Sequence, residues 1–384
     1  MTPWSFTRFL FALIILVFAS LAVLPAPTVT LFQIKFVCSE YGHWMVIAAV
    51  IVALLGGRRV ALDTASLIIG LLAAVLFMSS SVRASMMSAD IVRRFDAAFP
   101  PAEGATPSKS TPFSWPRLWS FSKPAPVEVQ VCDYTEHDNE PISLDFYPAQ
   151  GRPFAPCVLV LHTGGWDSGK RQEFQAFNNH LAQHGYAVAS MDYRLAPRWP
   201  WPAQRDDTVA AIRYLQAHAN DLGIDQKNNV LMGRSAGGQI AAATAFGKRD
   251  AAIRGVIAFY MPADLNYAWK YGKPNDVLNS TKLLKQFLGG EPETAQKNYD
   301  SASPFFLAKE ESPPTLLVHG AQDELVWTLQ SKRFNDQLAL VGAKHFYVEL
   351  PWATHGFDFN FNGPGGQIAE WAVERFLERV TAKP

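Results

Sequence analysis

The chain has 384 residues, which is long enough for one large domain and a further region. Its formal net charge is zero, so we expect neither a nucleic-acid partner nor electrostatic steering of a charged ligand. Hydrophobic residues make up 49% of the chain, a high share for a soluble enzyme, and the excess lies near the N-terminus. The three cysteines, Cys38, Cys132 and Cys157, have no spacing typical of a metal site or of a disulfide framework.

Three apolar runs occupy the N-terminal region, at residues 9–24, 44–57 and 60–82. A membrane-spanning helix needs about 20 mostly apolar residues. The third run reaches this length despite Asp63, and the first two reach it if flanking aromatic residues lie in the membrane interface. We therefore predict that residues 1–83 form a membrane region of about three transmembrane helices. In the alternative, the first run belongs to a cleaved signal peptide and two spans follow.

The arginines that flank these runs bear on the orientation of the chain. Arg8 precedes the first run, and Arg58 and Arg59 lie between the second and the third. Because positively charged loops stay in the cytoplasm, these residues favour a C-terminal part outside the cytoplasm. The opposite orientation is favoured by three arginines that follow the third run, Arg83, Arg93 and Arg94. We expect a multi-pass membrane protein with an extracytoplasmic catalytic domain.

Residues 84–126 are expected to connect the membrane region to a second domain. The segment 100–126 is rich in Pro, Ser, Thr and Lys and has no hydrophobic periodicity, which is typical of an extended linker. From residue 127 to the end, short apolar runs alternate with longer segments of helical period. The sequence therefore predicts one α/β domain over residues 127–384.

The order of elements in this domain predicts a mostly parallel sheet. An antiparallel hairpin is expected first, with strands at 127–134 and 142–147 around a polar turn. Further strands are expected at 157–162, 187–191, 230–232, 256–260, 315–319 and 346–350. Helices are expected at 174–183, 206–218, up to 246, at 330–340 and up to about 381. Strands that alternate with helices in this way imply right-handed crossovers between parallel neighbours.

The stretch Gly233-Arg234-Ser235-Ala236-Gly237 lies between a predicted strand and a predicted helix. A serine on such a sharp turn has an exposed hydroxyl, and the flanking glycines let the backbone turn without a side-chain clash. The helix that follows directs its free N–H groups toward the serine, so the Ala236 amide can bind an oxyanion. We predict that Ser235 is a nucleophile, with a glycine-rich packing turn as the alternative.

A serine nucleophile needs a base, and the base needs an orienting carboxylate. Asp323 follows the predicted strand 315–319, at the sheet edge where such folds hold their sites, and is the best candidate acid. Its neighbour Glu324 is the second choice, and a solvated loop acid is the alternative. His355 follows the last predicted strand and is the predicted base. We expect His319 to be a packing residue, and His345 lies at the wrong edge of the sheet.

Two glycines follow the predicted strand 157–162 and complete the site. The amides of Gly164 and Gly165, together with the amide of Ala236, are the predicted oxyanion hole. We expect no metal at this site. The strand 187–191 is followed by Asp192-Tyr193-Arg194, and we expect Arg194 to tie neighbouring loops together.

The same segments resemble a known family. The matching pieces are His162-Thr-Gly-Gly-Trp166, Asp192-Tyr-Arg-Leu-Ala-Pro197, Gly233-Arg-Ser-Ala-Gly-Gly238, Gly320-Ala-Gln-Asp323 and His355-Gly-Phe357. In these segments the chain from about residue 127 resembles the α/β-hydrolase superfamily, in the esterase/lipase branch of hormone-sensitive-lipase-like and carbohydrate-ester (feruloyl-esterase-like) enzymes. The resemblance implies a Ser235, Asp323 and His355 triad without a cofactor. Thr163 replaces the first glycine of the usual His-Gly-Gly-Gly run, and a membrane region stands in place of a soluble N-terminal cap.

These observations predict a membrane-anchored serine hydrolase that cleaves carboxylic esters through an acyl-enzyme. The expected substrates are small-molecule, lipid or carbohydrate esters, and the expected partner of the N-terminal region is the lipid bilayer. A peptidase or an amide or formamide hydrolase with the same triad stays open, as do an acyl transferase and an inactive membrane-tethered binding protein. The aromatic insert at 263–303 is expected to form either a small lid with an acyl or alcohol pocket or ordinary packing.

Overall fold

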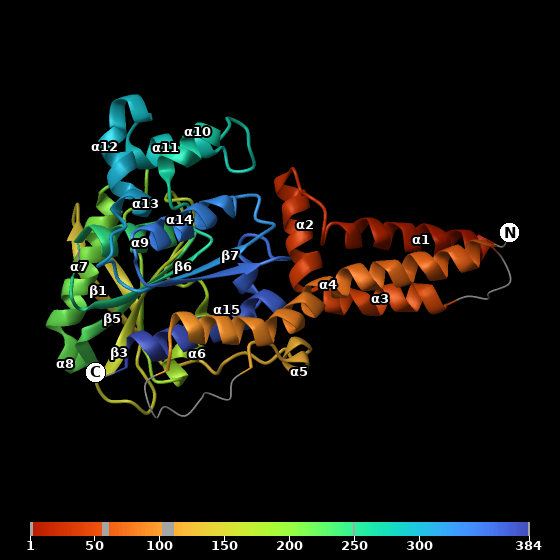
Figure 1. The fold of residues 1–384 in the computed structure, drawn as a ribbon, viewed down its shortest axis with the longest axis horizontal. Coiled ribbons are helices and arrows are strands. Elements are labelled where there is room, and N and C mark those ends of the chain that lie inside the picture. Colours follow the sequence, from red (N-terminus) through yellow and green to blue (C-terminus); the bar gives the residue numbers. More distant parts are fainter. Residues whose placement is uncertain (1–2, 56–60, 102–110, 249, 383–384) are drawn as a thin grey trace.

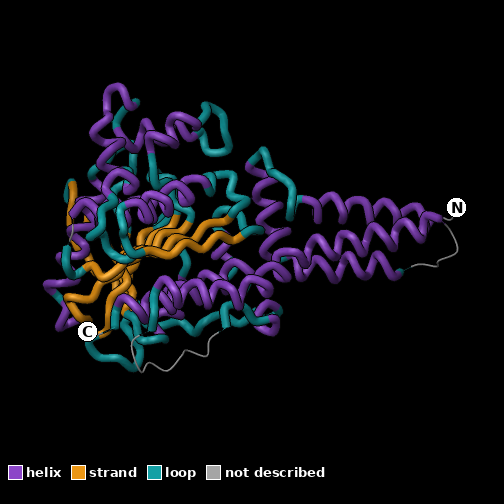
Figure 2. The backbone as a smooth tube through the Cα atoms, in the orientation of Figure 1, coloured by secondary structure: helices purple, strands orange, loops and turns teal. Residues whose placement is uncertain are grey.

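The computed structural model describes residues 3–55, 61–101, 111–248 and 250–382. A bundle of long helices projects from a rounded α/β domain, and helix α1 begins at the far tip of this bundle (Figure 1). The strands gather in one twisted sheet inside the α/β domain, with helices on both sides of it (Figure 2). The molecule therefore has a helical N-terminal region and an α/β domain.

The N-terminal region contains helices α1 to α4, and the first and last of them are the longest. The bounds are Pro3–Ser20 for α1, Val29–Glu40 for α2, Gly42–Leu54 for α3 and Ala61–Ala98 for α4. Helices α1, α3 and α4 lie side by side, whereas α2 crosses the end of the bundle next to the α/β domain (Figure 1). In the described residues, α1 and α4 are long and apolar enough to cross a membrane, and α2 with α3, bent by 84°, adds a third if counted as one broken span. Arg58 and Arg59, between the second and third apolar runs, lie outside the described residues.

Small residues and one ion pair hold the bundle together. A Cβ atom at Gly70 of α4 would lie 2.9 Å from the carbonyl oxygen of Ala49 of α3, so glycine allows a close approach of the two helices. The Arg8 guanidinium of α1 lies 3.1 Å from the Asp63 carboxylate of α4 and donates to the Ala53 carbonyl at 2.7 Å. Both charged side chains are buried, and pairing them avoids the cost of an isolated charge in apolar surroundings. This contact accounts for Asp63 in an otherwise apolar helix.

Helix α4 joins the bundle to the α/β domain. It continues without a break to Ala98, so the first part of the predicted 84–126 connection is helical. Near its end, the Phe95 ring packs against the rings of Phe346 and Trp371, with centroids 5.2 and 5.8 Å apart. The short helix α5 (Trp115–Leu118) lies further along the connection. The end of α4 is thus part of the hydrophobic core of the α/β domain.

The sheet of the α/β domain has eight strands in the order β1-β2-β4-β3-β5-β6-β7-β8. Strands β1 and β2 form the predicted antiparallel hairpin, β2 is antiparallel to β4, and the other neighbours are parallel. The bounds are β1 Gln130–His137, β2 Glu140–Tyr147, β3 Ala155–Leu161, β4 Ala187–Met191, β5 Ile224–Arg234, β6 Ile253–Phe259, β7 Thr315–Gly320 and β8 His345–Leu350. All strands that the sequence predicts are present.

Helices cover both faces of the sheet, which explains why the central strands are apolar on both sides. One core lies beneath α7, α9, α14 and the insert between β6 and β7, and the other lies beneath α6, α15 and the end of α4. The helices are α6 Gln175–Gln183, α7 Ala203–Ala217, α8 Ala219–Leu222, α9 Ala236–Lys248, α10 Leu265–Tyr271, α11 Ser280–Leu288, α12 Pro292–Ala302, α13 Pro304–Leu307, α14 Leu329–Leu340 and α15 Pro364–Val380, with a 3₁₀ helix at Phe357–Phe359. The loops after β3, β5, β7 and β8 therefore lie along one edge of the sheet, and they carry all the predicted site residues.

Candidate active site

Ser235 occupies a strained turn between β5 and α9. Its φ of +53° is a left-handed conformation that non-glycine residues seldom adopt, and its amide donates to the Phe259 carbonyl of β6 at 2.9 Å. A Cβ atom at Gly233 would lie 2.2 Å from the Gly237 carbonyl oxygen, and one at Gly237 would lie 2.3 Å from the His162 carbonyl oxygen. Because no side chain fits at either position, both glycines of the motif are required by packing. The turn is thus the sharp strand-to-helix bend that the sequence predicts.

Asp323 and His355, the predicted acid and base, are hydrogen-bonded to each other. His355 Nδ1 lies 2.6 Å from Asp323 Oδ2, which makes Nδ1 the protonated nitrogen and leaves Nε2 free to accept a proton. The amides of Leu325 and Val326 donate to Asp323 Oδ1, each at 2.9 Å, so the carboxylate is held on both oxygens. The predicted second choice, Glu324, instead pairs with Lys35 at 2.9 Å.

The environment of Asp323 keeps this carboxylate charged. Burial opposes its ionisation, but the charge of His355, then the hydrogen bonds from His319 and His355, lower the pKa of Asp323 to about 2. His319, expected as a packing residue, is fully buried, and its Nε2 lies 3.2 Å from Asp323 Oδ2 while its Nδ1 accepts from the Ser331 hydroxyl at 2.7 Å. His319 therefore also fixes the position of the acid. His345 begins β8, at the amino end of the strand, away from this edge.

The loop after β3 has the backbone conformation that the predicted oxyanion hole needs. Gly164 and Gly165 have φ values of +111° and +58°, and neither amide donates a hydrogen bond within the described part of the chain. Ala236 is the first residue of α9, where amides are also free. Thr163, which replaces the usual glycine, does not have a positive φ. Its amide and its hydroxyl both donate to the Glu173 carboxylate, at 3.1 and 2.8 Å. The substitution is therefore accommodated without strain at this position.

A buried ion pair that sequence reasoning missed joins two of these loops. Arg234 directly precedes Ser235, and its Nε donates to the Asp358 carboxylate at 2.5 Å, with both side chains fully buried. Three aromatic rings surround the guanidinium at 3.9–4.9 Å, and the Tyr260 hydroxyl donates to the other Asp358 oxygen at 2.7 Å. The Tyr260 ring also lies 4.4 Å from the His355 ring. These contacts fix the Ser235 turn relative to the loop of His355, the predicted base.

Arg194 has the structural role that the sequence predicts. Its guanidinium pairs with the buried Asp207 carboxylate of α7 at 2.7 Å and donates to the Ala203 carbonyl at 3.2 Å. The loop after β4 is thereby tied to the start of α7. Asp192, which directly follows β4, accepts from the Arg171 amide at 2.7 Å and so holds the loop that follows Gly164 and Gly165.

The insert between β6 and β7 covers an apolar pocket of about 130 Å³. One wall is formed by Leu283 and Leu284 of α11, and the other by Leu325, Val326 and Trp327 of the loop after β7. A Cβ atom at Gly165 would lie 3.4 Å from Leu283 Cδ1, so the pocket adjoins the loop of the predicted oxyanion hole. The insert thus combines ordinary packing with a wall of this pocket.

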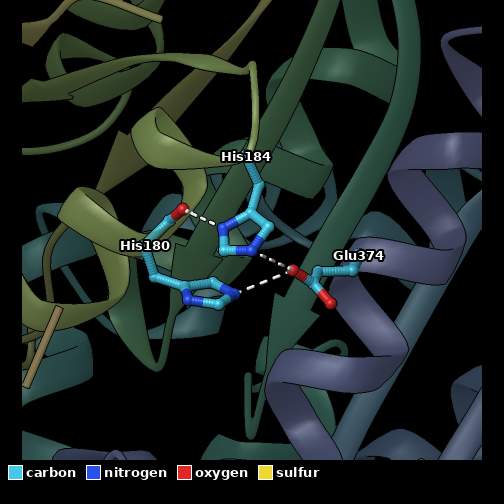
Figure 3. A group of neighbouring side chains, drawn as sticks. All are labelled: His180, His184 and Glu374. Carbon is cyan, nitrogen blue, oxygen red and sulfur yellow. Dashed lines mark hydrogen bonds and ion pairs between the residues drawn. The ribbon is translucent and has the colours of Figure 1, made fainter. Parts of the chain in front are cut away.

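Among the described residues, one group of side chains has the types and spacing of metal ligands. His180 lies on α6, His184 directly follows that helix and Glu374 lies on α15, with their ligand atoms within 4.8 Å of one another (Figure 3). His180 Nε2 lies 2.8 Å from the Glu374 carboxylate, and His184 Nδ1 donates to the His180 carbonyl at 2.7 Å. These bonds already satisfy the facing atoms of His180 and Glu374 and link the two helices. The group shares no residue with the site formed around Asp323 and His355.

The fold and the arrangement of these loops define an α/β-hydrolase of the esterase branch. A family model described as BD-FAE matches residues 144–338, just over half of the chain, and the chain belongs to this family.

Curated relatives agree with this assignment. The probable carboxylic ester hydrolase LipM of Mycobacterium tuberculosis (strain ATCC 25618 / H37Rv) is 30% identical over 244 residues, which cover 59% of this chain and 55% of LipM. Esterase LipQ of the same organism is 29% identical over 235 residues, which cover 58% of this chain and 55% of LipQ. The chain thus spans about half the length of the curated relatives it matches.

Solved structures show the same fold. A bacterial heroin esterase superimposes with a TM-score of 0.58 at 23% identity, covering 66% of this chain and 85% of that chain. An esterase of Pyrobaculum calidifontis gives a TM-score of 0.58 at 23% identity, covering 67% of this chain and 87% of that chain. The predicted α/β-hydrolase fold is confirmed.

Proposed function

We propose that the protein is a membrane-anchored serine hydrolase that cleaves carboxylic esters through an acyl-enzyme. The observation that carries the proposal is the 2.6 Å hydrogen bond between Asp323 and His355 at the sheet edge where Ser235 occupies its strained turn. The names of LipM and LipQ, a probable carboxylic ester hydrolase and an esterase, support the choice of esters over amides.

The proposed mechanism follows from the charge states of these groups. His355 Nε2 takes the proton of the Ser235 hydroxyl as its oxygen attacks the ester carbonyl, and the carbonyl oxygen gains a negative charge. The amides of Gly164, Gly165 and Ala236 stabilise that charge. The imidazolium then protonates the departing alcohol, and an acyl-enzyme remains.

Water completes the cycle by the same route. His355 removes a proton from a water molecule, the resulting hydroxide attacks the acyl-enzyme, and the carboxylic acid leaves as Ser235 regains its proton. Asp323, kept charged by its low pKa, stabilises the imidazolium in both halves of the cycle. The proposed residues supply every proton transfer, so the mechanism uses no cofactor.

In the same proposal, residues 1–83 anchor the enzyme in the bilayer, 84–126 connect the two parts, and 127–384 form the catalytic domain, on the extracytoplasmic side. Two or three apolar helices of sufficient length support the anchor. The first part of the 84–126 connection is rigid in this proposal, because α4 continues to Ala98 and Phe95 packs into the catalytic domain.

Labelling with a fluorophosphonate probe tests the proposal. The probe should modify Ser235 alone, as identified by mass spectrometry of the labelled peptide, and Ser235→Ala should abolish labelling. Labelling of intact cells by a membrane-impermeant probe is expected if the domain is extracytoplasmic. Labelling only after permeabilisation would reverse the orientation, and absence of labelling in both would refute the serine mechanism.

A further inference from the structure

We infer that the pocket beside Asp323 receives ester lipids directly from the bilayer, with helix α2 lying along the membrane surface next to the pocket. This inference rests on the proposed function and adds the source and class of the substrate. Three features of the structure support it: the contacts of α2 with the catalytic loops, the position of α2 on the bundle, and the lining and mouth of the pocket.

Helix α2 contacts the loop that carries the proposed acid. The Lys35 ammonium of α2 lies 2.9 Å from Glu324 Oε1, and the Ala26 amide donates to the same oxygen at 2.6 Å. Lys35 is only 2% exposed, so its ammonium is shielded from water, whereas the Glu324 side chain is 22% exposed. Glu324 directly follows Asp323 and is itself part of the pocket wall. The N-terminal region therefore touches the pocket through the contacts of Lys35 and Ala26 with Glu324.

The same helix contacts the loop that follows the proposed base. Glu40, the last residue of α2, is fully buried and accepts the Gly365 amide at 3.1 Å. Its backbone carbonyl accepts from the Asn360 side chain at 2.8 Å. Helix α2 is thus fixed against the loop after β7 at Lys35, and against the loop after β8 and the start of α15 at Glu40. This arrangement fixes the distance between the pocket and the end of the helix bundle.

The direction of α2 determines how far the pocket lies from the membrane surface. Helices α1, α3 and α4 run along the bundle, whereas α2 crosses its end at 84° to α3 (Figure 1). When the bundle spans a bilayer, α2 lies in the interface on the side of the catalytic domain. A helix with its side chains is about 10–12 Å across. Since Glu324 contacts α2 directly, the pocket opens within about one helix diameter of the membrane surface.

The pocket and its mouth suit an apolar chain entering from the membrane. Its walls are mostly aliphatic and aromatic, and the carboxylate of Glu324 is neutralised by Lys35. Trp327, on the same loop, is 47% exposed, and Leu329, the first residue of α14, is 42% exposed. Tryptophan is the residue type preferred at membrane interfaces. The mouth of the pocket therefore has the side chains of an interfacial surface.

The test uses full-length protein reconstituted in phosphatidylcholine vesicles, with a fluorogenic diacylglycerol ester as the bilayer substrate and 4-methylumbelliferyl acetate as the soluble one. The diacylglycerol ester is placed either in the vesicles that hold the enzyme or in separate vesicles. Substrate in the enzyme's own vesicles should be hydrolysed about a hundredfold faster, because both are confined to one surface. Equal rates in the two arrangements, or no turnover of this ester in either, would overturn the inference.

Two variants separate the pocket mouth from the chemistry. Trp327→Ser should lower turnover of the bilayer ester about tenfold and turnover of the soluble acetate much less, because one interfacial anchor is lost. Leu340→Ser is the matched control, since Leu340 ends α14, does not line the pocket and is 81% exposed. It should leave both rates unchanged. Equal effects of Trp327→Ser on the two substrates would contradict the inference. If the wild-type protein does not hydrolyse 4-methylumbelliferyl acetate at all, this result would instead contradict the proposed function.

Discussion

The buried pair of Arg234 and Asp358 gives a stability prediction that can be worked out from the structure. Asp358→Asn removes the negative charge with little change in shape and leaves the guanidinium buried without a counter-charge. Breaking one partner of a buried pair costs about 3–5 kcal/mol. Three aromatic rings within 4.9 Å of the guanidinium retain part of its stabilisation. We therefore expect a loss of about 3 kcal/mol, at the lower end of that range.

The assay is guanidinium chloride unfolding of the full-length protein in detergent micelles, followed by tryptophan fluorescence. The matched control is Asp138→Asn, because the pair of Asp138 with Arg198 is 2.9 Å long but its side chains are 61% and 57% exposed. Exposed pairs contribute about 0–1 kcal/mol, so this variant should unfold close to the wild-type midpoint. Equal losses in Asp358→Asn and Asp138→Asn would refute the reasoning.

A double variant isolates the charge from the change in packing. Arg234→Met alone leaves the Asp358 carboxylate buried with one hydrogen bond, from Tyr260, and should also be destabilising. In Arg234→Met combined with Asp358→Asn neither charge is present. The double variant should therefore lose less free energy of unfolding than the sum of the two single losses, by at least about 1 kcal/mol. Additive losses would show that the two residues act independently, against the ion-pair account.

The remaining predictions concern the acid and the oxyanion loop. Asp323→Asn should lower kcat on p-nitrophenyl acetate about 10⁴-fold, because Asn favours the wrong imidazole tautomer; a loss below tenfold would contradict the assigned role. The pKa of Asp323 is lowered to about 2, so its ionised form stabilises the fold above about pH 4, and this contribution is lost as the pH falls toward 2. The melting temperature of the wild type should therefore fall more than that of Asp323→Asn as the pH is lowered over this range. Parallel curves of melting temperature against pH would argue against this contribution of Asp323. Gly164→Ala should remove activity and lower the melting temperature, because its Cβ would lie 2.0 Å from the Ser168 carbonyl oxygen. Gly165→Ala, whose Cβ has 3.4 Å to its nearest neighbour, should keep a melting temperature closer to the wild type; the reverse order would contradict this account of the loop.

The strands and the site loops could be predicted because their signals are local. Short apolar runs bounded by turn residues predicted each strand, and the residues directly after β3, β5, β7 and β8 were the predicted site residues. The pairing of Asp323 with His355 followed from the requirement that a base needs an orienting carboxylate, and the 2.6 Å hydrogen bond agrees with it.

Contacts between distant parts of the chain could not be predicted from one sequence. Arg234 and Asp358 are 124 residues apart, and Lys35 and Glu324 are 289 residues apart. Neither pair leaves a periodic signal, because each partner is an isolated charge in a different element. The helix at 84–98 is not predicted for a related reason. The apolar run ends at residue 82, whereas α4 continues to Ala98 because Ala84, Ile91 and Phe95 pack against the α/β domain.

The measurement that tests the central claim most directly is the rate of p-nitrophenyl butyrate hydrolysis by Ser235→Ala, compared with the wild-type protein at equal concentration and with circular dichroism as the check on folding. Alanine in place of Ser235 removes only the hydroxyl and breaks no contact on which the fold depends. We predict that the variant keeps the wild-type spectrum and loses at least about 10³-fold in kcat. A folded variant that hydrolyses the ester at the wild-type rate would contradict the proposal that Ser235 is the nucleophile.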